Sequence, residues 1–155
     1  MAVRDATCMP DKADPMDVPK VLKCLNAALR LQQRSVLQLT AASGSMFGIE
    51  VQGLANELWA FAAAELDDTR RLVEKITALG GDPTTDVAPL SWTSDPRKAL
   101  EALAEQEEET IAALHKVIPP SGQEPRSEAL EHLMEHLIMR KQNQVDFLWR
   151  ALRKP

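Results

Sequence analysis

Polar side chains interrupt four apolar stripes in the sequence, each near the middle of its stripe. The interrupting residues are Gln32 on the first stripe, Glu65 and Asp68 on the second, Glu107 on the third, and Lys141 and Gln144 on the fourth. Isolated buried charges are costly, so three carboxylates, two amides and one ammonium at a common height need a common cause. One such cause is a metal centre, because four-helix bundles direct Glu and Glu-x-x-His ligands inward to bind two metals.

Two pairs of these residues have the spacing of a Glu-x-x-His motif, but their residue types differ from that motif. Glu65-x-x-Asp68 carries aspartate in the histidine position, and Lys141-x-x-Gln144 carries neither ligand type. A donor set made only of oxygen suits Mn, Mg or Ca better than Zn. The candidate metal ligands are therefore Glu65, Asp68 and Glu107, while Gln32, Lys141 and Gln144 occupy the other ligand positions.

Three interpretations of this polar cluster are open. Two metal ions could be bound, or one divalent cation (Fe or Mn) could be held by the three carboxylates with the two amides as neutral donors. In the third interpretation, which we favour, Lys141 replaces the metal electrostatically and forms a buried salt-bridge network with Glu65, Asp68 and Glu107. One positive charge against three negative charges leaves a surplus of two, which a shared proton or a pocket containing water must balance.

A second pattern with metal-binding spacing is His132-Leu-Met-Glu135-His136. Two histidines at positions i and i+4 of a helix can share a metal. His132 and Glu135 lie off the stripe that runs from Leu130 to Leu137, so we expect a solvated helix face here. The acidic run 105–109 is also expected to be solvated, with Glu107 alone turned inward.

The elements that must position these residues are four amphipathic helices. We expect them over 18–43, over 47–79, from Asp95 to before Pro119, and over 126–152. Gly44 interrupts the first helix, and Gly80-Gly81 with Pro83 ends the second. Ser94-Asp95-Pro96 is a helix start, with a capping residue followed by proline in the first turn.

The aperiodic stretch 82–92, with two prolines, predicts a long crossover between the second and third helices. The predicted fold class is therefore all-α, an up-down-down-up four-helix bundle over 18–155. Residues 1–17 are expected to be a flexible N-terminal tail, because they hold two prolines and several charges but no apolar core.

Composition and charge exclude several classes of function. The net charge of -5 disfavours nucleic acid as a partner, since phosphate binding favours a basic face. No apolar run approaches the ~20 residues of a membrane span, and no secretory signal precedes the bundle. Cys8 and Cys24 form no disulfide framework and have no neighbours that would make them nucleophiles, so we expect a cytoplasmic protein.

Three short segments resemble the bacterioferritin branch of the ferritin-like superfamily. They are Leu25-Asn26-Ala27-Ala28-Leu29 for the opening helix, Leu72-Val73-Glu74-Lys75-Ile76 with Leu79-Gly80-Gly81-Asp82-Pro83 for the second helix, and Val145-Asp146-Phe147-Leu148, similar to that family's Ile-Asp-Trp-Leu. The likeness covers nearly all of Leu25 to Leu152 and implies a ferritin-like bundle with a long B–C crossover.

Carried over position by position, the resemblance implies a degenerate di-iron site. The family's first glutamate falls on Gln32, and its helix-B Glu-x-x-His on Glu65 and Asp68. Its helix-C glutamate falls on Glu107 or, with a shift of one residue, on Glu108. Its helix-D Glu-x-x-His falls on Lys141 and Gln144.

Other family features also change. The methionine that ligates haem at the family's dimer two-fold falls on Leu66, so no haem is expected, and the tyrosine near the iron site falls on Leu39. The family's short fifth helix has no counterpart, which disfavours a closed cage. Trp59 and Trp149 flank the stripes, where they either belong to a dimer face or seal the bundle edges.

From these residues we expect a non-haem bundle protein that has lost most ferroxidase chemistry. It would act as a homodimer or small homo-oligomer, as a scaffold or accessory protein with an unknown protein partner. No cofactor is expected, or at most one non-haem divalent metal. The alternative is a divergent iron- or manganese-binding protein of iron storage or oxidative-stress handling that uses Glu65, Asp68 and Glu107.

Overall fold

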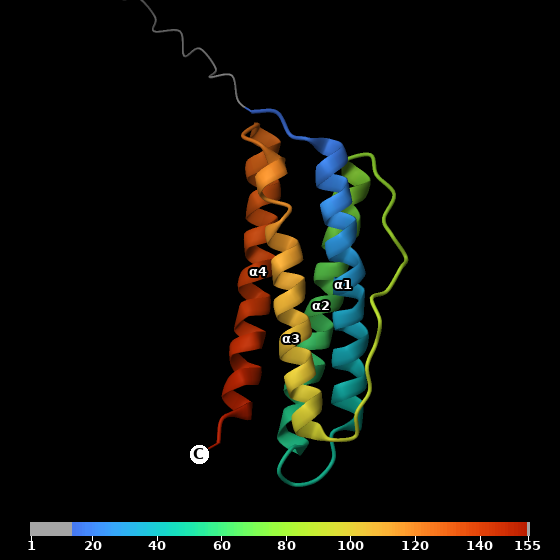
Figure 1. Ribbon diagram of the computed structural model, residues 1–155, viewed down its shortest axis with the longest axis vertical. Coiled ribbons are helices and arrows are strands. Elements are labelled where there is room, and N and C mark those ends of the chain that lie inside the picture. Colours follow the sequence, from blue (N-terminus) through green and yellow to red (C-terminus); the bar gives the residue numbers. More distant parts are fainter. Residues whose placement is uncertain (1–13, 155) are drawn as a thin grey trace, which may run out of the picture.

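The computed structural model describes residues 14–154, which form four long helices, one 3-10 turn and no strand. The helices are α1 (Val18–Ser45), α2 (Gln52–Ala78), α3 (Pro96–His115) and α4 (Pro125–Leu152), and the turn η1 covers Pro119–Ser121. α1 and α4 run in one direction and α2 and α3 in the other (Figure 1). The predicted all-α, up-down-down-up bundle is confirmed, with the long connection between α2 and α3.

Two helices begin at aspartates that act as caps. The Asp17 side chain accepts a hydrogen bond from the backbone N–H of Lys20, and Asp95 accepts from Arg97 and Lys98. In both helices a proline follows in the first turn, where its missing N–H costs nothing. The start of α3 predicted from Ser94-Asp95-Pro96 is confirmed.

The connection between α1 and α2 differs from the prediction. α1 runs through Gly44 to Ser45, because a single glycine in a last helical turn costs only about 1 kcal/mol. α2 begins at Gln52 instead of near residue 47. Gly48, with φ of 96°, makes the turn between the two helices, a backbone conformation that favours glycine.

The expected N-terminal tail lies outside the described residues as far as residue 13. From Asp14 to Asp17 the chain packs against the turn before α4. Gln123 N donates to Asp14 O at 2.8 Å, Asp17 N donates to Pro120 O at 3.0 Å, and Met16 is buried. Residues 14–17 therefore belong to the bundle.

A polar layer divides the apolar core into two halves. One half gathers leucines at the end of the bundle where α1 begins, and the other gathers those at the opposite end. The fully or nearly fully buried members include Leu25, Leu29, Leu72, Leu114, Leu130 and Leu137 in the first half, and Leu39, Leu58, Leu103 and Leu148 in the second. Apart from Ser121 and Ser127 near the start of α4, the buried polar side chains lie between the two halves in sequence along each helix.

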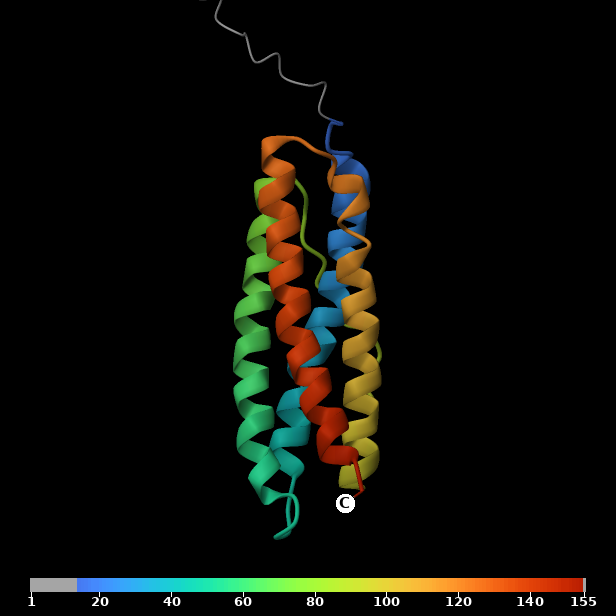
Figure 2. The ribbon, with the colours of Figure 1, turned by 90° about the vertical axis from the view of Figure 1, so that its left-hand side faces the viewer.

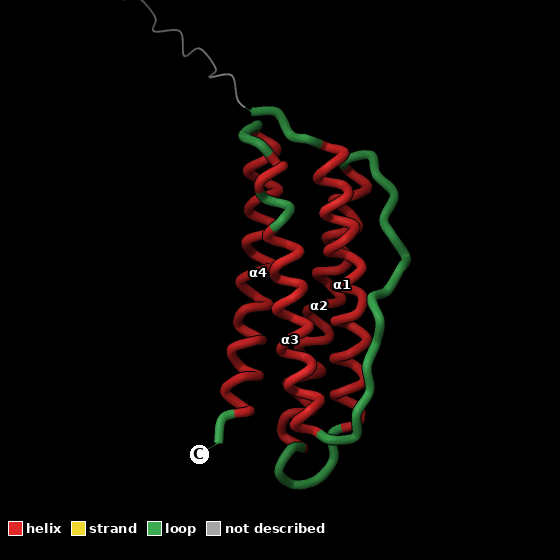
Figure 3. The backbone as a smooth tube through the Cα atoms, viewed as in Figure 1, coloured by secondary structure: helices red, strands yellow, loops and turns green. Residues whose placement is uncertain are grey.

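The crossover from α2 to α3 extends beside α1 along the length of the bundle, as Figure 2 and Figure 3 show. Side-chain amides of α1 hold it in place. Asn26 donates to Asp82 O and accepts from Thr84 N, and Gln33 donates to two backbone carbonyls. Gln38 donates to Ser91 O and accepts from Ser91 N, each at 3.0 Å. These bonds satisfy backbone groups of a segment that has no strand partner.

None of the described helices combines the length and the apolar character that a bilayer span requires.

Candidate site at the polar layer of the bundle

Lys141 is the centre of the polar layer. Its Nζ atom lies 2.6 Å from Oε2 of Glu65 on α2 and 2.6 Å from Oε2 of Glu107 on α3. Ser35 Oγ on α1 accepts a weaker hydrogen bond from the same nitrogen at 3.4 Å. The side chains of Lys141, Glu65 and Glu107 are at most 1% exposed. One ammonium thus joins α4 to the three other helices.

Gln32 on α1 also donates hydrogen bonds to Glu65. Its Nε2 donates to Oε2 of the Glu65 carboxylate and, at 3.1 Å, to the Glu65 backbone carbonyl. The amide therefore orients the carboxylate that faces Lys141. Hydrogen bonds to a charged acceptor inside a protein are stronger than those between neutral groups.

Asp68 has a different partner from the one expected. It lies one helical turn beyond Glu65 on α2, and its Oδ1 atom is 3.1 Å from Nη1 of Arg140 on α4. The Asp68 side chain is 1% exposed, and the Arg140 side chain is 28% exposed. With Arg140 added, three carboxylates face two cations, so the surplus of two negative charges expected from the sequence becomes one.

Burial and the neighbouring charges shift the pKa values of three buried groups. Burial raises the pKa of the Glu65 carboxyl although Lys141 opposes the rise, and the neighbouring Glu107 adds to it. Burial also raises the pKa of Asp68 against the opposing charge of Arg140. Burial alone would lower the pKa of Lys141, but Glu107 and Glu65 outweigh it and raise that pKa above its ordinary value.

Several oxygen atoms of the layer accept no hydrogen bond from the residues that the structure describes. Gln144, the remaining predicted position, is 3% exposed and lies in the layer. Its Oε1 accepts no hydrogen bond from the described residues. The same holds for Oε1 of Gln32, Oε1 of Glu65, both carboxylate oxygens of Asp68, and Oε1 of Glu107. The layer therefore has more acceptors than donors.

These residues do not fit a pair of metal ions. The ammonium of Lys141 contacts both Glu65 and Glu107, where a di-metal centre would place a cation. Among residues 14–154, no three His, Cys, Asp or Glu side chains are grouped so that they could hold a metal ion. Of the three candidate ligands, the structure brings Glu65 and Glu107 together on Lys141, and Asp68 contacts Arg140 instead.

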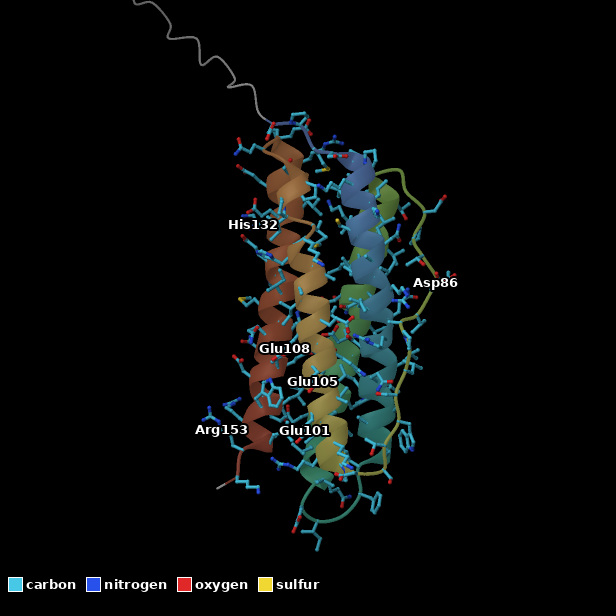
Figure 4. All side chains as sticks on the ribbon, viewed as in Figure 1. Asp86, Glu101, Glu105, Glu108, His132 and Arg153 are labelled. Carbon is cyan, nitrogen blue, oxygen red and sulfur yellow. The ribbon has the colours of Figure 1, made fainter. Side chains whose placement is uncertain are left out.

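The other patterns from the sequence lie on the surface. His132 is 85% exposed and projects from α4 (Figure 4), and its Nδ1 lies 3.5 Å from Oε2 of Glu135. Glu107 is the inward residue of its acidic run, as predicted, since Glu105 and Glu108 are exposed on α3. Glu108 accepts a hydrogen bond from Trp149 Nε1 at 2.9 Å, which ties α3 to α4.

Sequence reasoning missed two residues of the layer. Ser35 is 1% exposed and accepts from Lys141, but serine among glutamines on a helix gives no distinct signal. Arg140 precedes Lys141 and lies beside the apolar stripe of α4, so the sequence does not indicate its contact with Asp68. The available signal was the uncompensated negative charge, which called for a second cation beside Lys141.

Comparison with known proteins places this geometry in a family. The family model for the ferritin-like domain matches residues 22–154, nearly the whole described chain. The chain belongs to the ferritin-like family. No curated protein matches the chain.

Solved structures of ferritin-like proteins share the fold. A ferritin-like diiron-carboxylate protein from Bacillus anthracis str. Ames is 26% identical with a TM-score of 0.79, covering 88% of this chain and 98% of that one. A bacterioferritin from Rhodobacter capsulatus, described with a metal-free dinuclear site and haem iron, is 22% identical with a TM-score of 0.78, covering 86% and 84%. A dodecameric thioferritin from Bacteroides fragilis is 16% identical with a TM-score of 0.79, covering 88% and 86%.

Within this ferritin-like chain, the polar layer therefore occupies the middle of the bundle, where the resemblance places the family's metal ligands. A bacterioferritin is among the solved structures that share this fold. The helix-C glutamate corresponds to Glu107 and not to Glu108, because Glu107 is fully buried and Glu108 is exposed.

Proposed function

We propose that this chain is a non-haem ferritin-like protein in which Lys141 replaces the metal and which does not oxidise iron. The observation that carries the proposal is the contact of Lys141 Nζ with Glu65 and Glu107, 2.6 Å from each. An ammonium between two carboxylates supplies the positive charge that a metal would supply. It also repels a second cation strongly, because the layer is buried and its effective dielectric constant is lower than that of water.

The identities of the α4 residues support this proposal. A ferroxidase centre needs two metals held by several ligands, and the helix-D ligand positions here are Lys141 and Gln144. Two side chains supply the positive charge that metal ions would supply. Lys141 pairs with Glu65 and Glu107, and Arg140 pairs with Asp68. Leu66 at the haem-ligand position, 61% exposed on α2, offers no ligand to haem iron.

A bundle without metal chemistry acts through its surface, and we propose that this chain is a dimeric scaffold or accessory protein. The outer face of α2 carries Trp59, 58% exposed, and Leu66. Leu66 lines a shallow apolar groove with Ala63 and Val73. Large exposed apolar side chains at helical spacing mark an interaction surface, and here the proposed occupant is a second copy. Trp149 is tied to Glu108 and belongs to the α3–α4 edge instead.

The second candidate function is a divergent iron- or manganese-binding protein that uses Glu65, Asp68 and Glu107. The buried oxygens without hydrogen-bond donors among the described residues, such as Oε1 of Gln144 and Oδ2 of Asp68, favour it, since they could face a cation. Binding would require Lys141 to leave its two carboxylates. Its complete burial and its two short contacts oppose that movement.

Iron oxidation under air tests the proposal. Purified chain freed of metal is mixed with Fe(II), and dioxygen uptake is recorded beside a protein-free control. The expected uptake equals that of the control. Uptake that rises with protein concentration, disappears in Glu65→Ala and persists in Glu105→Ala, an exposed carboxylate of α3, would overturn the proposal.

A further inference from the structure

The polar layer places an amine against two carboxyl groups in a site without bulk water. Lys141 Nζ lies 2.6 Å from Oε2 of Glu65 and from Oε2 of Glu107, and the three side chains are at most 1% exposed. Each side chain comes from a different helix, so the packing of α2, α3 and α4 fixes their relative positions. Proximity and fixed orientation can lower the barrier of a reaction between two groups by several kcal/mol.

We propose that Lys141 and Glu65 join in an intramolecular isopeptide bond, with Glu107 as the base. This inference rests on the contact that carries the proposed function: the ion pair is the reactant, and in the cross-linked chain the amide fills the metal position in place of the ammonium. The bond would link α2 to α4 permanently. The sequence separation of the two residues would make the cross-link a large constraint on the unfolded chain.

The reaction is balanced without any oxidant or co-reactant. The Lys141 nitrogen forms a bond to the Glu65 carboxyl carbon, Cδ, and the bond from that carbon to one carboxyl oxygen breaks. The ammonium loses two protons and keeps one. Glu65 enters the reaction as the protonated acid. Glu107 takes one proton from the nitrogen and keeps it, and the second proton goes to the departing hydroxyl of Glu65, which leaves as water. The products are one secondary amide, one water molecule and a protonated Glu107 carboxyl.

Hydrogen bonding selects Glu65 over Glu107 as the carboxyl that reacts. Gln32 Nε2 donates to Oε2 of Glu65, whereas Glu107 has no donor besides Lys141 among the described residues. An amide donor fixed on a carboxyl oxygen stabilises the negative charge that develops there during attack. Glu107 is left free to serve as the base, with its oxygen within hydrogen-bond reach of the attacking nitrogen.

The environment also favours the amide over the ion pair. Two charges removed from water lose several kcal/mol of hydration each, and an amide carries no charge. Exclusion of water opposes the reverse reaction, hydrolysis of the amide. The amide N–H that remains after the reaction points to a ready acceptor, since Glu107 already contacts the same nitrogen.

Intact-mass spectrometry of the full, denatured chain tests the inference. The expected mass is lower than the mass of the sequence by one water molecule. Lys141→Arg keeps a cation at the position but cannot form the amide, so it should show the full mass of its sequence. A wild-type chain at full mass, both fresh and after prolonged incubation at neutral pH, would overturn the proposal whether or not the chain binds metal.

Tryptic mapping identifies the two partners. Modified Lys141 blocks cleavage after itself, so peptide 141–150 should appear joined to peptide 35–70, which contains Glu65. A link to peptide 99–116, which contains Glu107, would overturn the assignment of Glu65. Glu107→Gln should leave most chains at full mass, and a cross-linked fraction equal to that of the wild type would contradict the role of Glu107. Iron oxidation in the same samples tests the proposed function separately.

Discussion

The Nζ atom of Lys141 on α4 lies 2.6 Å from Oε2 of Glu107 on α3, and both side chains are buried between the two halves of the apolar core. The same nitrogen contacts Glu65 on α2 at an equal distance. A charge at the centre of a bundle is normally expensive, and here each charge has an opposite partner. The stability of the fold therefore depends on this layer being complete.

Replacement of Lys141 by methionine should destabilise the chain by about 3–5 kcal/mol, because the Glu65 and Glu107 carboxylates would remain buried without their cation. Urea unfolding followed by circular dichroism measures the change. Lys98→Met, at an exposed position on α3, is the control and should be nearly neutral. Equal unfolding midpoints for the two variants would show that Lys141 does not hold the layer together.

Asp68 should make the chain less stable as the pH rises. Its pKa is raised by burial from an ordinary value of 3.8, so the folded state holds this proton more tightly than the unfolded state. As the pH rises above 3.8, the Asp68 carboxyl loses its proton first in the unfolded chain. The stability that Asp68 contributes then decreases until the pH passes the pKa of Asp68 in the folded chain. Asp68→Asn should therefore gain stability relative to the wild type as the pH rises.

The measurement for Asp68 is the urea midpoint at a series of pH values. Asp67→Asn provides the control, since Asp67 is an exposed neighbour paired with Arg71. It should keep the pH slope of the wild type. A parallel slope for Asp68→Asn would mean that the Asp68 carboxyl is ionised equally in both states.

The burial of the polar layer could be predicted from the sequence alone. Gln32, Glu65, Glu107, Lys141 and Gln144 each replace an apolar residue in a helical stripe, and all of them are at most 3% exposed. The helical period of about 3.6 residues determines which positions face inward, so burial can be predicted from the spacing. The favoured interpretation requires the Lys141 side chain to point inward, and the structure shows this direction.

The partners of Asp68 and of the crossover could not be predicted. Arg140 reaches Asp68 from a position beside the stripe, and such reach depends on how α2 and α4 pack. Asn26, Gln33 and Gln38 lie at spacings of seven and five, which resemble an ordinary solvated face of α1. Their partner is the crossover, a segment without helical or strand periodicity, so the sequence does not predict its path over the surface.

The amide side chains of α1 should hold the crossover locally. Gln38→Ala removes both hydrogen bonds to Ser91 and should cost about 1–2 kcal/mol, since each net bond contributes roughly 1 kcal/mol. Amide hydrogen exchange should accelerate at Ser91. It should stay slow at Thr84, because the Thr84 N–H still donates to Oδ1 of Asn26. Asn26→Ala should give the reverse pattern. Equal acceleration at both amides in either variant would mean that the crossover opens as one unit.

Leu66 should be necessary for self-association through the outer face of α2. Leu66→Glu places a charge at the centre of that face, so sedimentation velocity should show the monomer at concentrations where the wild type is a dimer. Leu90→Glu changes an exposed leucine of the crossover and should leave the dimer intact. A wild-type chain that sediments as a monomer, or a dimer that survives Leu66→Glu, would contradict the proposed face.

The most direct test of the central claim, that Lys141 stands in place of a metal, is the metal content of the chain after anaerobic Fe(II) incubation and removal of free ions. Inductively coupled plasma mass spectrometry would be applied to the wild type, Lys141→Glu and Glu65→Ala. The account predicts no stoichiometric iron or manganese in the wild type, and metal uptake only where Lys141 is replaced by a carboxylate. One or more metal ions per wild-type chain, lost in Glu65→Ala, would contradict it and establish the metal-binding alternative.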